Sequence, residues 1–177
     1  MKKLDVCPTW EDFESLFLEF ESEDERDQKI EDYENDFTFS VDGGCTLTGA
    51  FSEGFPEALE VEELIDEDTI DWATLDAGTP FMINYQGKQL QCYESGFEDD
   101  EEEAFYYEGI TALSNLLLEL GLVLKQFVPT GIGSDLVFAL IPLEIWNKGL
   151  ETFGLDELRE IFVDFGDPKI FEYLMEE

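Results

Sequence analysis

The chain reads Glu98-Asp99-Asp100-Glu101-Glu102-Glu103 directly before Ala104-Phe105-Tyr106-Tyr107, and it then continues as Ile110-Thr111-Ala112-Leu113-Ser114-Asn115-Leu116-Leu117-Leu118-Glu119-Leu120-Gly121. Apolar residues recur every three or four positions from Ile110 to Leu120, which predicts a central helix with one buried face. The six carboxylates precede it at the positive end of the helix macrodipole. Gly121 can adopt the left-handed conformation that ends a helix.

The whole chain combines a large apolar content with an extreme charge. Its 177 residues are 44% hydrophobic and 14% aromatic, so we expect one folded domain with a substantial core and not a disordered acidic tail. The 45 acidic residues face only 9 basic ones, a net charge of −36. Self-repulsion of this size destabilises the compact state, which raises the question of what the charge is for.

The few basic residues leave long acidic stretches without a partner nearby in sequence. No Lys or Arg occurs between Ile30 and Gly87 or between Gln89 and Leu124. Direct binding to nucleic acid and binding to an anionic membrane surface are excluded on this ground.

The net charge is comparable to that of DNA. A globule of this mass has roughly 9,000 Å² of surface, or about one net negative charge per 240 Å². About 40 Å of duplex, on the order of this domain's diameter, carries roughly 24 charges. A protein with much of its charge on one side would present a phosphate-like field.

The first half predicts helices and two hairpins. Thr9 caps a helix whose apolar face begins at Trp10, and residues 19–36 form either a solvated helix or a mobile link. Residues 37–51 alternate around Gly43-Gly44 as a hairpin, and Pro56 opens a short helix whose Leu59, Leu64 and Ile65 pack inward. Residues 81–93 give the clearest hairpin.

The second half predicts two strands and further helices. Residues 122–128 and 135–141 read as strands, the latter buried on both faces because it is apolar throughout. Residues 143–153, 156–165 and 169–175 read as helices. The fold class is therefore α+β: a single domain with one mixed or mainly antiparallel sheet, a long central helix and C-terminal helices packed against it. A subdivision into residues 1–97 and 98–177 is left open.

Catalytic and metal-binding patterns are missing from the sequence. The chain has no histidine, no G-x-S-x-G and no G-x-x-x-x-G-K, and Gly131-Ile132-Gly133 leads into a strand and not into a phosphate-binding helix. The acid-rich segments lack EF-hand spacing, and with 45 acids a carboxylate pair carries no information. We expect no enzyme activity, no catalytic residue, no cofactor and no dedicated metal site.

The cysteines and the N-terminal residues indicate the cellular compartment in which the protein acts. Cys7, Cys45 and Cys92 are odd in number and widely spaced, which is typical of a reduced intracellular chain. No apolar stretch follows Lys2-Lys3, and none is long enough to span a bilayer. We expect a cytoplasmic protein.

The density of acids around an aromatic-rich core resembles that of DNA-mimic inhibitors such as the phage antirestriction proteins, and equally that of acidic immunity proteins that neutralise nuclease toxins. The segments Leu113–Gly121, Gly133–Pro142 and the following helix through Trp146 resemble small bacterial domains found in such immunity contexts. The resemblance covers about 60 residues and assigns no functional residue. It implies a stoichiometric inhibitor.

These observations predict an inhibitor that binds the basic, nucleic-acid-binding surface of a defence nuclease, restriction enzyme or nuclease toxin, with carboxylates in place of phosphates. Phe105, Tyr106 and Tyr107 cannot all be buried on one helix face, so one or two are expected to anchor the partner unless neighbouring elements cover them. The expected partner-binding residues are Glu98, Asp99, Asp100, Glu101, Glu102, Glu103, Tyr106, Tyr107, Glu23, Asp24, Glu25, Glu31, Asp32, Glu60, Glu63, Asp66, Glu67 and Asp68.

Two alternatives stay open. The charge could merely solvate an acidic adaptor or a salt-adapted protein, although salt adaptation usually comes with fewer large apolar residues than the 16 Phe found here. An enzyme that uses carboxylates and a metal is the third hypothesis. A homodimer is compatible with all three.

Overall fold

The apolar run predicted as a doubly buried strand lies near the centre of the structure. The computed structural model describes residues 4–42, 45–95, 100–129 and 135–167. Strand β5 (Asp135–Pro142) pairs on one side with β1 (Thr38–Asp42) and on the other with β4 (Leu122–Phe127), and β4 also pairs with the short β6 (Phe162–Val163). All pairings are antiparallel, in the order β1-β5-β4-β6. The predictions of strands at 122–128 and 135–141 are confirmed.

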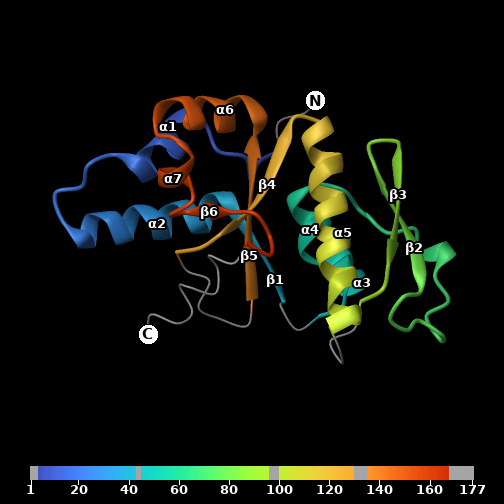
Figure 1. Cartoon of the computed structure of the whole chain (residues 1–177). Helices are drawn as coiled ribbons and strands as arrows, with labels where there is room; N and C mark the ends of the chain where they lie inside the picture. Colours follow the sequence, from blue (N-terminus) through green and yellow to red (C-terminus); the bar gives the residue numbers. More distant parts are fainter. Residues whose placement is uncertain (1–3, 43–44, 96–99, 130–134, 168–177) are drawn as a thin grey trace.

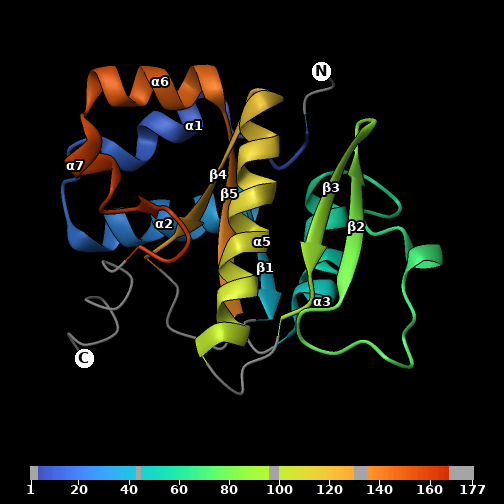
Figure 2. The ribbon, with the colours of Figure 1, turned by 45° about the vertical axis from the view of Figure 1, so that its right-hand side comes forward.

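Both faces of this sheet are covered, because successive side chains along a strand point to opposite faces. Leu124, Phe138 and Leu140 belong to one core cluster, and Val123, Ala139 and Ile141 belong to a second. Figure 2 shows the layers in order: helices α1, α2 and α6, then the sheet, then α5, then the hairpin of β2 and β3. An α+β fold with a long central helix is confirmed.

Helix α5 (Asp100–Glu119) is the predicted central helix. Ile110, Leu113 and Leu117 are at most 1% exposed, and they pack in the first core cluster. Gly121 follows with φ of +82°, in the left-handed conformation expected of it. Strands β2 (Pro80–Tyr85) and β3 (Lys88–Tyr93) form the predicted hairpin, but as a separate two-stranded sheet outside α5 (Figure 1).

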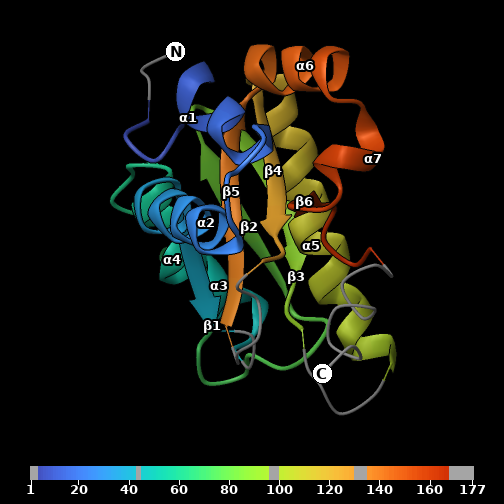
Figure 3. The ribbon, with the colours of Figure 1, turned by 90° about the vertical axis from the view of Figure 1, so that its left-hand side faces the viewer.

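The N-terminal helices cover the other face of the sheet (Figure 3). Thr9 caps α1 (Trp10–Glu14) through a capping box with Asp12, and the 3₁₀ helix η1 (Ser15–Phe17) follows. The sequence predicted either a solvated helix or a mobile link over residues 19–36. The structure shows a helix, α2 (Glu23–Phe37).

The predicted hairpin over residues 37–51 is wrong. Its first strand, β1, pairs with β5, which is far away in sequence, and its second half is helix α3 (Leu47–Ser52). The backbone N–H groups at the start of α3 donate to Thr46, Ser95 and Glu94 side chains. Because these acceptors satisfy the first turn, and Leu47, Ala50 and Phe51 bury one face, the helix is preferred over the strand.

Two helix boundaries also differ from the prediction. Helix α4 (Gly54–Ala58) begins before Pro56 and ends before the buried residues Leu59, Leu64 and Ile65. The 3₁₀ helix η2 (Glu67–Thr69) follows. In the C-terminal part, α6 (Leu143–Thr152) confirms the helix predicted there.

The helix predicted over 156–165 is wrong beyond α7 (Leu155–Leu158). Phe162 and Val163 pair with Phe127 and Gln126 as strand β6, because the edge of β4 offers backbone groups that a helix could not use. The helix predicted at 169–175 lies outside the described residues. None of the described helices is long and apolar enough to cross a membrane.

Candidate functional site: the acidic helix α2 and the cavity beside it

Helix α2 is the most acidic described element. Its 15 residues hold eight acids and two bases, a net charge of −6 over about 22 Å of helix. Residues 21–29 are all exposed. Asp24, Asp27 and Glu31 follow one another at the three-and-four spacing that places side chains on one face, and all three are exposed. We call these three residues the α2 stripe.

Capping and burial keep α2 helical despite this repulsion. The Ser22 side chain accepts a hydrogen bond from the Glu25 backbone N–H (3.2 Å), and three acids occupy the first turn, where the macrodipole favours negative charge. On the inner side Ile30 and Tyr33 are buried, and the Tyr33 ring stacks on Phe127 at 5.7 Å. Burial raises the pKa of Tyr33 well above its ordinary value, so its hydroxyl stays neutral.

Basic side chains of the described residues do not neutralise this helix. The ion pairs found among the described residues are Lys88–Glu119, Lys125–Asp164 and Arg159–Asp167, and none involves α2. Lys148 lies 3.7 Å from the Trp10 ring centroid, so its charge faces an aromatic ring. The carboxylates of α2 therefore face solvent with most of their field intact.

A second acidic surface lies at the other end of the molecule. Glu63 and Asp68 are exposed, and Asp66 is half-buried, around η2. Figures 1 and 2 show η2 and α2 on opposite sides of the sheet and α5, so the structure does not bring the two predicted groups of acids together. Glu60 is exposed too, and its carboxylate accepts a hydrogen bond from the Asp5 backbone N–H (2.7 Å).

The acidic run before α5 is only partly described. Glu98 and Asp99 lie outside the described residues. Residues 100–103 form the first turn of α5, but their side chains lie outside the described part, as does that of Glu67.

The prediction that Tyr106 anchors a partner is wrong for the folded protein. Tyr106 is only 2% exposed, and desolvation raises the pKa of its hydroxyl above the ordinary value. Phe165, which follows β6, lies 5.8 Å from its ring and stacks on Tyr107 at 5.0 Å, while Tyr93 covers Phe105 at 5.9 Å. Elements from both sides thus cover the aromatics, and Tyr107 is left half-buried.

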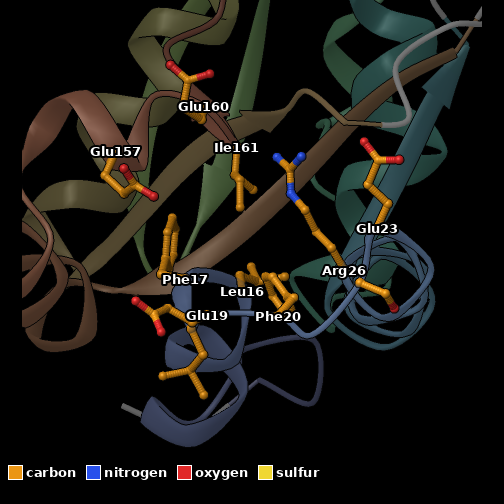
Figure 4. Close-up of a pocket in the computed structure, with 11 residues that line it drawn as sticks. Leu16, Phe17, Glu19, Phe20, Glu23, Arg26, Glu157, Glu160 and Ile161 are labelled. Atoms are coloured by element: carbon orange, nitrogen blue, oxygen red, sulfur yellow. The ribbon is translucent and has the colours of Figure 1, made fainter.

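A cavity of about 380 Å³ lies at the N-terminal end of α2 (Figure 4). Its walls come from η1 and the residues after it, from the first turn of α2, and from α7 and the residues after it. The lining residues are Leu16, Phe17, Leu18, Glu19, Phe20, Ser22, Glu23, Arg26, Glu157, Glu160 and Ile161. No local sequence pattern predicts this cavity, because three segments far apart in sequence form it.

A larger cavity of about 920 Å³ lies between the N-terminal segment, the start of α1 and the start of α6. Its lining is mostly apolar, and it contains one acid, Glu144, and one base, Lys148. Within the described ranges, no three His, Cys, Asp or Glu side chains are grouped so that they could hold a metal ion.

Comparison of the chain with protein families, with curated proteins and with solved structures found no match.

Proposed function

We propose that this protein is a non-catalytic, stoichiometric inhibitor that occupies the basic nucleic-acid-binding surface of a partner protein. The carboxylates of α2 take the places of phosphates. The partner class is a nucleic-acid-acting protein such as a defence nuclease, a restriction enzyme or a nuclease toxin.

The observation that carries this proposal is the linear charge density of α2. One strand of duplex DNA carries a charge every ~3.4 Å of axis, or roughly six over the ~22 Å that α2 spans. Helix α2 has a net charge of −6 over the same length. A groove of basic residues that fits one DNA strand would therefore find a similar number of charges along this helix.

The rigid attachment of α2 supports the same function. Ile30 and Tyr33 fix one side of the helix on the core, so the exposed carboxylates are held in place before binding. Preorganised charges lose little conformational entropy on binding, and a strong field increases the association rate with a basic partner. These gains offset the self-repulsion that a net charge of −36 imposes.

The three cysteines support action in a reducing compartment such as the cytoplasm. None of Cys7, Cys45 and Cys92, all of which are described, forms a disulfide.

A second candidate function is that of an acidic adaptor whose charge only solvates it. The exposed acids around η2, at the opposite end from α2, favour it, because a single partner groove would not contact both ends. In that case the negative charge only keeps the protein solvated, and no basic partner binds it tightly.

The test is a pull-down with the whole chain as bait, at low and then moderate salt. We expect one basic nucleic-acid-acting protein to be retained and then displaced by added DNA or RNA. If instead a mixture of basic proteins is retained at low salt and moderate salt removes all of them, the result would contradict the inhibitor proposal and support the acidic adaptor.

Variants of the α2 stripe refine this test. Asp24→Asn, Asp27→Asn and Glu31→Gln together should weaken the retained complex roughly tenfold, because three surface charges at the contact are lost. The control removes three exposed charges near η2, by Glu62→Gln, Glu63→Gln and Asp68→Asn, and should have little effect. Equal losses for the two triple variants would show that net charge alone, and not α2, determines binding.

A further inference from the structure

The larger cavity, of about 920 Å³, has the size and the lining of a small-molecule site. Such sites are mostly apolar and contain a few polar groups that orient the ligand. Leu4 and Leu122 are buried in its walls, and the half-buried side chains of Leu143 and Ile145 complete them. The cavity therefore offers an apolar molecule a surface to pack against.

Contacts between distant segments hold these walls in place. The Trp10 ring of α1 stacks on Phe153, which follows α6, at 6.1 Å between ring centroids. Figures 2 and 3 show α1 and α6 side by side at one end of the molecule. The Leu143 N–H donates to the Gly121 carbonyl oxygen (2.9 Å), which ties the start of α6 to the residue before β4. The cavity is therefore formed before a ligand binds, and little conformational entropy is lost on binding.

The start of α6 adds hydrogen-bond donors to this apolar lining. No side chain caps the N-terminus of this ten-residue helix. The backbone N–H groups of Glu144 and Ile145, which both line the cavity, donate to no side chain and to no other element among the described residues. Because the helix macrodipole places partial positive charge at this end, the free donors favour an anion.

Lys148 adds a full positive charge one helical turn further along α6. Its ammonium lies 3.7 Å from the Trp10 ring centroid and forms no ion pair with any described carboxylate. Residues four apart share one face of a helix, so Lys148 lies on the same face as Glu144. The carboxylate of Glu144 opposes an anion, but the side chains lining the cavity are neutral in sum, in a chain whose net charge is −36.

We propose that this cavity binds a small amphipathic anion, with its apolar body against Leu122 and Ile145 and its single anionic group between Lys148 and the N-terminus of α6. Complementarity of charge selects the anionic group, because the ammonium and the free N–H groups are both positive. The inference goes beyond the proposed function and does not rest on it, since α1, α6 and the N-terminal segment form this cavity and α2 does not line it.

The experiment compares two dyes that fluoresce strongly when they enter an apolar site. Anilinonaphthalenesulfonate carries one negative charge, and phenylnaphthylamine has the same rings without the sulfonate. Each dye is titrated into the whole chain at about 0.15 M salt, which screens the long-range repulsion of the acidic surface. We expect the anionic dye to bind at one saturable site. Binding of the neutral dye alone, or of neither dye, would overturn the proposal.

Lys148→Met tests the charge, because it removes the ammonium and keeps an apolar stem. It should weaken binding of the anionic dye roughly three- to fivefold and leave binding of the neutral dye unchanged, since a partly exposed charge pair contributes modestly. Glu144→Gln should tighten binding of the anionic dye about twofold. The control is Lys29→Met, because Lys29 is exposed on α2 and does not line the cavity. Equal losses for the two lysine variants would contradict the anion site.

Ile145→Trp tests the location of the site, because a larger side chain would fill the cavity. Both dyes should then bind several-fold more weakly. If they bind this variant as tightly as the unmodified chain, they bind elsewhere and the cavity is not the site. Thermal unfolding of each variant verifies that the fold is intact. The pull-down tests the inhibitor separately, so either proposal can fail while the other stands.

Discussion

At the residue scale, the cysteine and tyrosine side chains buried on the hairpin side of the core are neutral, whereas the carboxyl group of Glu94 is buried there among the hydrogen-bond donors Thr48 N–H and Ser95 N–H. Cys92 of β3 is 3% exposed, and burial raises the pKa of its thiol from the ordinary 9.0 to about 11. Burial also raises the pKa values of Tyr85 and Tyr106. Burial therefore keeps these thiol and phenol groups protonated at neutral pH.

The thiol of Cys92 predicts how stability depends on alkaline pH. Its folded-state pKa lies above the unfolded value, so its stabilising contribution is complete below about pH 9 and is lost as pH rises toward about 11. Urea unfolding measured from pH 8 to 11 should show stability falling with pH. The fall between pH 9 and 10 should be shallower in Cys92→Ala, because the tyrosines respond only at higher pH and Cys45, whose pKa burial also raises, is present in both proteins.

If the stability of the unmodified chain and that of Cys92→Ala fall equally steeply between pH 9 and 10, this role of Cys92 is contradicted. The absolute stability of Cys92→Ala is expected to be lower at every pH, because the substitution removes a buried sulfur.

At the element scale, close contact between short helices and the sheet determines the local structure. Helix α4 lies directly against β1, and a Cβ atom at Gly54 would lie 2.5 Å from the Ser40 carbonyl oxygen and 2.9 Å from Val41 Cγ2. The first contact is with backbone, which cannot rotate away. Glycine is therefore required at position 54 because a larger side chain would clash with β1, and not because the backbone there has a positive φ.

Gly54→Ala is expected to lower the free energy of unfolding by about 1–3 kcal/mol, because α4 or β1 must shift to accept the methyl group. Urea unfolding measures this change. The control is Gly49→Ala in α3, where the nearest atom, Cys45 Cβ, is 3.1 Å away, and stability should stay within about 1 kcal/mol of the unmodified chain. A neutral Gly54→Ala would show that the two elements are less closely packed than described.

At the scale of the whole molecule, the charge is unbalanced. The described residues contain three ion pairs, whereas the net charge is −36. Repulsion between carboxylates should therefore outweigh attraction between opposite charges. The apolar side chains buried on both faces of the sheet must therefore stabilise the fold enough to offset the repulsion between surface carboxylates.

Salt should stabilise this protein. Raising NaCl from about 0.01 M to about 1 M shortens the Debye length from about 30 Å to about 3 Å and screens the repulsion, so Tm should rise by several degrees. Thermal unfolding followed by circular dichroism measures the shift. The triple variant of the α2 stripe should have a higher Tm at low salt and a smaller response. A Tm that falls with salt would mean that ion pairs dominate.

Much of the fold was predictable from local patterns. The three-and-four spacing of Ile110 to Leu120 predicted α5, the continuous apolar run predicted β5, and the alternation around Gln86-Gly87 predicted the β2–β3 hairpin. Each of these signals is complete within one element. The prediction failed at residues 47–52 and 159–165, where the partners that decide between helix and strand are Glu94, Ser95 and β4.

The sequence by itself determined the excess of acid, the scarcity of basic partners and the elements with a strong internal period, because these depend on composition and on neighbours along the chain. Only the tertiary structure decided that Tyr106 is buried, that the acids of α2 and those around η2 lie at opposite ends, and that η1, α2 and α7 enclose a cavity with an acidic rim. These features depend on contacts between distant segments, and no local pattern records which segments will meet.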